Sequence, residues 1–95
     1  MIRELERQIR EKEAYLAERR ETQAEARKTA NRYRQAHQEA MDVLNHRAAE
    51  LALEEYADAQ ALVTELQADI DRLVSDIDGL QRLIADTQAV RAVAA

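Results

Sequence analysis

Two histidines are the side chains of this chain that most readily suggest metal binding. His37 and His46 are nine residues apart, so they do not share one face of a helix. A structural zinc site needs more ligands than this pair supplies, and no Glu-x-x-His sequence of the di-iron bundle type occurs. The spacing therefore predicts histidines that are solvated or lie in a turn, and it predicts no bound metal or other cofactor.

Carboxylates could transfer protons, and they are concentrated in the second half of the chain. They include Glu54, Glu55, Asp58, Asp69, Asp71, Asp76 and Asp78. Paired carboxylates do acid–base chemistry only in a cleft that perturbs their pKa values, and these fall largely outside the apolar stripe described below. Glycine-rich phosphate loops and Ser/His/Asp spacings do not occur either. The pattern predicts a solvated acidic face and no enzymatic activity.

A basic stretch without any acid occupies residues 26–38. Its basic side chains are Arg27, Lys28, Arg32 and Arg34, joined by His37. A helix with this composition could contact phosphates, so binding of nucleic acid is one hypothesis. Basic-region leucine zippers differ, because there the heptads follow the basic region directly and an Asn-x-x-Ala-Ala pattern is present. The net charge of −5 favours the other interpretation, in which these residues complement the acidic second half.

The elements that position these side chains are helices that require partner helices. Apolar residues recur in sevens, with Val or Ile first and Leu three residues later, which is typical of a coiled coil. The repeat contains Val63, Leu66, Ile70, Leu73, Ile77, Leu80 and Ile84, and a second set contains Ile2, Leu5, Ile9 and Leu16. We expect these eleven residues to form an oligomer interface. Lys12 interrupts the first set, and steps of four from Leu44 to Tyr56 interrupt the heptads between the sets.

Composition supports one helical domain over residues 1–95. Ala supplies 19 of the 44 hydrophobic residues, while Phe, Trp, Pro and Cys are absent and Gly occurs once. Such a chain lacks the aromatic side chains that fill a compact core, so its apolar groups must lie in stripes along helices. Without Cys, disulfides and thiolate chemistry are excluded.

Charge and side-chain size both favour antiparallel pairing of the two halves. Residues 1–40 carry a net charge of +2 and residues 41–95 a net charge of −7. Folding about residue 45 brings large aliphatic side chains together at one end, and it places Lys12 near Asp78 and Arg19 near Asp71. We therefore predict an all-α hairpin with a first helix over about 2–42, a turn near 42–47, a second helix over about 48–90 and a frayed C-terminus over 91–95. Asn45 is the predicted residue that ends the first helix in the left-handed conformation.

A continuous helix is the alternative architecture. It would be about 140 Å long at ~1.5 Å per residue and would pair antiparallel with a second copy. In the hairpin, Leu62, Val74 and Leu83 flank the seam and make its apolar face wider than two helices require. We therefore expect the hairpins to dimerise into a four-helix bundle.

The pattern indicates a non-enzymatic scaffold, assembly adaptor or inhibitor that acts through helix–helix contacts. In composition the chain is similar to small bacterial or phage-encoded assembly factors. The expected partners are a second copy and another protein, with a nucleic-acid-binding helical dimer as the alternative. No apolar run approaches the ~20 residues that a membrane span needs, and the charged N-terminus does not begin a signal peptide, so we expect a cytoplasmic location without membrane contact.

Overall fold

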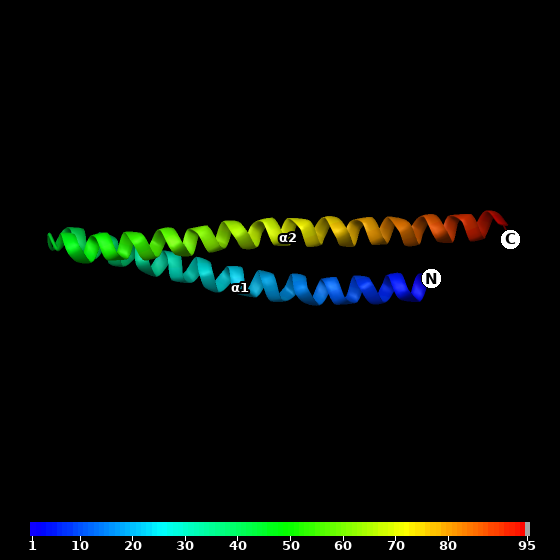
Figure 1. Cartoon of the computed structure of the whole chain (residues 1–95), viewed down its shortest axis with the longest axis horizontal. Coiled ribbons are helices and arrows are strands. Elements are labelled where there is room, and N and C mark those ends of the chain that lie inside the picture. The colour runs from blue at the N-terminus through cyan, green and yellow to red at the C-terminus, as the bar shows by residue number, and fades with distance from the viewer. Residues whose placement is uncertain (95) are drawn as a thin grey trace.

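The chain forms two long α-helices joined by a short turn (Figure 1). In the computed structural model, which describes residues 1–94, α1 spans Ile2–Asp42 and α2 spans His46–Ala94. The predicted hairpin is confirmed, and its turn, residues 43–45, falls within the predicted 42–47. Residues 91–94, for which we expected fraying, continue α2, and residue 95 lies outside the described part of the chain.

The hairpin is a thin rod. Its principal-axis extents are 76 × 15 × 13 Å, so the continuous helix of about 140 Å is ruled out. In Figure 1 the two ribbons cross near the turn and then run side by side toward the termini, as supercoiled helices do. The C-terminal end of α2 extends past the N-terminus of α1.

A single seam joins the helices, and its positions alternate in threes and fours without a break. In α1 the seam consists of Ile2, Leu5, Ile9, Lys12, Leu16, Arg19, Gln23, Ala26, Ala30, Tyr33, His37 and Ala40. In α2 it consists of Ala49, Ala52, Tyr56, Ala59, Val63, Leu66, Ile70, Leu73, Ile77, Leu80, Ile84 and Thr87. Every one of these side chains is buried or half-buried. The heptad pattern therefore covers nearly the whole chain.

Two details of the predicted seam were wrong. Lys12 does not interrupt the seam but occupies one of its positions, half-buried, because its long methylene stem can pack while the ammonium reaches the edge. The steps of four counted from Leu44 do not exist in the fold, because Leu44 lies in the turn and is 74% exposed. The seam of α2 begins instead at Ala49, which is 4% exposed.

The turn satisfies the backbone groups at the end of α1 through two short-range bonds. The Asn45 amide donates to the Ala40 carbonyl at 2.8 Å, and the Leu44 amide donates to the Met41 carbonyl at 3.1 Å. This is the Schellman pattern, which needs one residue at positive φ, and Leu44 fills that place at φ 56°. An L-residue other than Gly or Asn adopts this conformation at a steric cost.

The predicted role of Asn45 was wrong, because Asn45 begins the second helix rather than ending the first. Its side-chain Oδ1 accepts a hydrogen bond from the Ala48 amide at 3.1 Å, and its carbonyl accepts one from the Ala49 amide at 3.0 Å. This is the geometry of an N-cap, for which Asn is among the preferred residues. The positive φ falls one residue earlier, on Leu44.

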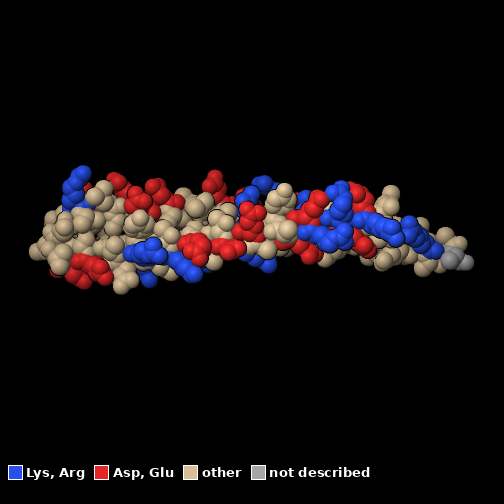
Figure 2. Space-filling view, turned by 90° about the horizontal axis from the view of Figure 1, so that it is seen from below, with Lys and Arg blue, Asp and Glu red and all other residues tan. Residues whose placement is uncertain are grey.

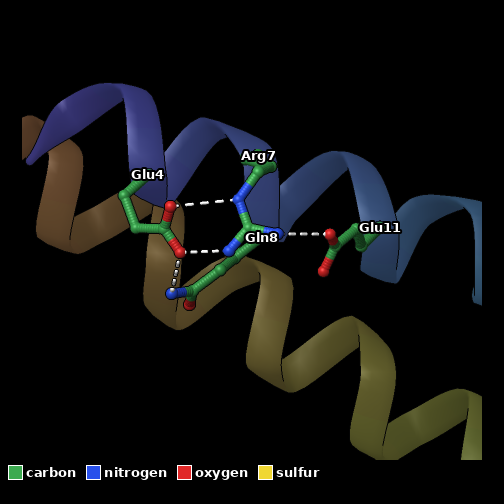
Figure 3. A network of polar contacts seen from close by, with 4 residues as sticks. All are labelled: Glu4, Arg7, Gln8 and Glu11. Atoms are coloured by element: carbon green, nitrogen blue, oxygen red, sulfur yellow. Dashed lines mark hydrogen bonds and ion pairs between the residues drawn. The ribbon is translucent and has the colours of Figure 1, made fainter.

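The first turns of α1 carry a small polar network centred on Arg7 (Figure 3). Arg7 forms ion pairs with Glu4 and, at 2.6 Å, with Glu11, and Gln8 donates to Glu4. The hydrogen bond from Arg7, followed by that from Gln8, holds the pKa of Glu4 below its ordinary value. Because that pKa is lowered, the contact stabilises the folded chain at neutral pH and is lost as the pH falls; at this exposed site the contribution is small.

We predict opposite effects for two neighbouring substitutions in the turn. Leu44→Gly should stabilise the hairpin by about 1 kcal/mol, since Gly adopts positive φ without a steric cost and the leucine buries little surface. Asn45→Ala should destabilise it by about 1 kcal/mol, since the cap of α2 is lost. Thermal unfolding followed by circular dichroism, at one protein concentration, measures both. A lower melting temperature for Leu44→Gly would contradict the assignment of the turn.

Candidate interaction surface

Two polar contacts between the helices show how α1 and α2 are aligned. Lys12 Nζ lies 3.5 Å from Asp76 Oδ2, and Gln23 Nε2 lies 3.2 Å from the carbonyl oxygen of Val63. Residues at the same level along the rod therefore have numbers that add to about 89, in agreement with the predicted fold about residue 45.

Lys12 and Arg19 lie at about the levels of Asp78 and Asp71, as predicted, but neither forms an ion pair with that neighbour. Lys12 pairs with Asp76 rather than with Asp78, because Asp76 borders the seam while Asp78 points away from it and pairs with Arg82 at 3.0 Å. Arg19 forms no ion pair within residues 1–94. Asp71, its predicted partner, accepts a hydrogen bond from Gln67 at 2.9 Å instead.

Gln23 is the one buried polar side chain in the described part of the chain, at 8% exposure. Its Nε2 donates to the Val63 carbonyl and, at 2.9 Å, to Gln67 Oε1. Gln67 in turn donates a hydrogen bond to Asp71 Oδ1. A buried amide must find such partners, so this contact favours one alignment of the helices over others.

All eleven residues predicted to form an oligomer interface lie in the seam between α1 and α2 of one chain. Leu5, Leu66, Ile70 and Ile77 are buried at 5–8% exposure. The others are half-buried: Ile2, Ile9, Leu16, Val63, Leu73, Leu80 and Ile84. Their part in contacts between chains remains a prediction.

The seam leaves much apolar surface uncovered. No described side chain is fully buried, and several core positions are alanines, such as Ala30 at 3% exposure. Large apolar side chains remain exposed along the rod, for example Tyr15, Leu51, Leu53, Leu62, Val74 and Leu83 at 41–56%. Two helices can cover each other only along one line, so a hairpin of this kind has room for further helices.

One side of the rod, which we call the acidic face, is formed by the heptad positions c and g of both helices. It carries two arginines, Arg32 and Arg72, and eleven carboxylates: Glu4, Glu11, Glu18, Glu25, Glu39, Glu55, Asp58, Glu65, Asp69, Asp76 and Asp86. The exposed apolar residues Tyr15, Leu62 and Leu83 belong to this face. A groove of about 260 Å³ runs along it between Thr29 of α1 and Leu62 of α2.

The opposite side, which we call the basic face, is formed by heptad positions b and e. It carries five carboxylates and five arginines, so its charges balance overall. Along its central part, residues 20–34 of α1 and 55–69 of α2, the charged side chains are only Arg20, Arg27 and Arg34, facing Gln60 and Gln67, and Asp71 lies just beyond this part. Figure 2 shows charges of both signs distributed along the rod and an uncharged tip at the end that carries the turn.

Two grooves lie along the central part of the basic face. One, of about 380 Å³, is lined by Arg27, Ala30, Asn31, Gln60 and Val63. The other, of about 590 Å³, is lined by Asn31, Arg34, Gln35, His37 and Gln38. The small seam residues at this level leave space beside the backbone, and the lining offers hydrogen-bond donors and no carboxylate, which suits an anionic partner.

The basic stretch predicted from the sequence is thus divided between faces. Arg27 and Arg34 lie on the basic face, Arg32 lies on the acidic face, and Lys28 points outward and pairs with Glu25 of its own helix at 3.3 Å. The interpretation in which these residues complement the acidic second half is wrong at the level of contacts, because among residues 1–94 none of the four forms an ion pair with α2.

The histidines occupy different environments. His37 is half-buried in the seam and lines a groove, whereas His46 is exposed at the start of α2. Within residues 1–94 no three His, Asp or Glu side chains are close enough together to hold a metal ion. Neither helix, as far as residue 94, has a stretch long and apolar enough to cross a membrane.

Sequence reasoning missed the polar members of the seam. Lys12, Arg19, Gln23 and His37 all occupy seam positions in α1. Counting sevens from Ile2 finds Gln23 and His37, and counting sevens from Leu5 finds Lys12 and Arg19, but a search for apolar residues alone passes over all four. Such polar residues lower the stability of a coiled coil and in return restrict its alignment.

Comparison of the chain with protein-family models, with curated proteins and with solved structures finds no match.

We predict that Ile77→Asp unfolds the hairpin, because it removes a residue that is 8% exposed and buries an unpaired charge. The expected loss is about 3 kcal/mol or more. Gly79→Ala, two residues away, is the matched control: an added Cβ meets no atom within 4 Å, so the better helix propensity of Ala should stabilise α2 by about 1 kcal/mol. Thermal unfolding of both variants is the measurement. An unchanged melting temperature for Ile77→Asp would show that the seam does not hold the fold together.

Proposed function

We propose that this protein is a non-enzymatic helical interaction protein, a scaffold, assembly adaptor or inhibitor that acts through helix–helix contacts. The observation that carries the proposal is the incomplete seam: no described side chain is fully buried, while large apolar side chains remain exposed along the rod. Burial of apolar surface is the main driving force for association, so further helices packed on this rod would be stabilised.

The first partner that we propose for this surface is a second copy of the chain. Two hairpins packed together form four helices, and this arrangement would bury side chains such as Leu62, Val74 and Leu83 that one hairpin leaves at 41–48% exposure. Because these flanking residues lie on both faces of the rod, either face can take part. A helix of another protein is the second kind of partner, and it would make the hairpin an adaptor.

The proposed setting is the cytoplasm, and the proposed origin is a bacterial or phage-encoded assembly system. The first is supported by the absence of an apolar run of membrane-spanning length, and the second by a composition similar to that of small bacterial or phage-encoded assembly factors. The rod shape suits a spacer or a brace between larger components.

Solution mass and small-angle scattering test self-association. We expect the mass to rise with concentration from the chain mass of 10.9 kDa to at least twice that value. The maximum dimension should stay near the 76 Å of the hairpin if the copies pack side by side. A mass of one chain at all concentrations, up to the millimolar range, would contradict the proposed association between copies.

Nucleic-acid binding is the second candidate function, and one observation favours it. Arg27 and Arg34 have no ion-pair partner within residues 1–94, and both line grooves without a carboxylate. Free guanidinium groups spaced along a helix can contact phosphates. The strongly acidic opposite face weighs against tight binding, because it repels a polyanion.

Duplex DNA at low salt tests this second candidate. If it is correct, binding should weaken steeply with added salt and should be abolished by Arg27→Glu combined with Arg34→Glu. The matched control is Arg47→Glu combined with Arg82→Glu, which makes the same change in net charge on the outer sides of the helices. Equal loss of binding in both double variants would indicate a general effect of charge, and no binding at low salt would exclude this function.

A further inference from the structure

In the central part of the rod, the two faces of the hairpin carry opposite charges at the same level. Arg20 and Arg34 lie on the basic face, and their level partners on α2, Asp69 and Glu55, lie on the acidic face. Arg27 lies between them, level with Leu62. Because the two faces point in opposite directions, these charges cannot reach each other within one chain.

Most of these side chains have no ion-pair partner in their own chain. Within residues 1–94, Arg20, Arg27 and Arg34 form none, nor does Glu55. Asp69 has only a distant contact with Arg72, at 3.7 Å. The charges that flank the seam on both sides are therefore available to another molecule.

We propose that copies of this protein stack side by side, with the basic face of one hairpin on the acidic face of the next at the same level of the rod. The inference rests on the self-association proposed above and specifies its interface. When two copies stack without a shift along the rod, Arg20 of one copy lies level with Asp69 of the next, and Arg34 lies level with Glu55. These positions all border the seam, so they lie near the midline of their faces.

The grooves on the two faces also lie at matching positions along the rod. The groove beside Arg27 on the basic face and the groove beside Leu62 and Asp58 on the acidic face lie at the same level. In the stack, the Arg27 side chain reaches the acidic groove, where its stem packs on Leu62 and its guanidinium meets Asp58. Arginine suits this place, since its apolar stem and planar charged head can satisfy both.

Charge excludes the simplest two-fold arrangement on the acidic face. Two acidic faces packed together would oppose eleven carboxylates with eleven more, which is strongly unfavourable. A face 76 Å long and 15 Å wide covers about 1,100 Å², more than the ~800 Å² per partner of an ordinary stable interface. Stacking basic face on acidic face uses this area and sets five arginines and five carboxylates, rather than eleven more carboxylates, against the acidic face.

Such stacking is open-ended. Each added copy leaves one acidic and one basic face uncovered. The contact is therefore heterologous, since it joins two different faces, and it does not close on itself in a pair. The assembly is therefore a row of parallel rods with their turns at the same end, rather than a dimer with two-fold symmetry.

Two complementary variants test this arrangement. The first, Arg20→Glu with Arg34→Glu, blocks the basic face, and the second, Glu55→Gln with Asp69→Asn, blocks the acidic face. We expect each variant alone to have the mass of one chain in sedimentation or light scattering, while the wild type grows with concentration beyond two chains. An equimolar mixture should form a terminated one-to-one complex, because the intact acidic face of the first variant meets the intact basic face of the second.

The other possible results of this experiment can be distinguished from the expected one. Circular dichroism verifies that both variants remain helical, and Arg47→Glu with Arg82→Glu, on the outer sides of the helices, should assemble like the wild type. If both variants assemble normally, or if their mixture stays at the mass of one chain, the stacking is wrong while self-association stands. Loss of assembly in the first variant alone would indicate a two-fold contact between basic faces and would also overturn the inference. A wild type that never associates contradicts this inference and the proposed self-association together.

Discussion

The alignment of α1 on α2 is the constraint on which the rest of this structure depends, and the buried amide of Gln23 is its most specific element. Gln23 donates to the Val63 carbonyl and to Gln67, which in turn donates to Asp71. A slip of one heptad toward the C-terminus of α2 would put Val74 in the place of Gln67, so the amide would lose its side-chain partner at a cost of about 1 kcal/mol. The short turn enforces the same alignment, because residues 43–45 leave no slack between the helices.

The hairpin could be predicted from the sequence because two independent patterns agree with it. Large aliphatic side chains lie at both ends of the chain and small ones in the middle, so antiparallel pairing of the two halves brings like sizes together, for example Leu16 level with Leu73 and Ala30 level with Ala59. The basic first half and acidic second half make parallel pairing unfavourable by charge. The turn region was also marked by poor helix formers, which is why its position was found within one or two residues.

Other features could not be predicted from composition and apolar spacing. A leucine is an unexpected residue at positive φ, and only the backbone geometry and hydrogen bonds of the turn reveal it. The search for apolar residues skipped Lys12 and Gln23, so the seam seemed to break where it continues. The flanking residues Leu62 and Val74 were taken as one widened face, yet they lie on opposite faces of the rod, since positions e and g point to opposite sides of a seam.

The division of charge between faces follows from where the ion pairs are satisfied. Lys12 with Asp76 is the one ion pair between the helices in the described residues, while the others join neighbours three or four residues apart along one helix. Electrostatics therefore contributes little to holding α1 on α2, and the central arginines stay free of the carboxylates on the other side. Because the two helices cover the seam only in part, apolar surface remains that a partner can bury. The charges beside the seam determine which partners can bind there. On the acidic face that partner must bring positive charge, and the same chain presents such charge at the same level on its opposite face.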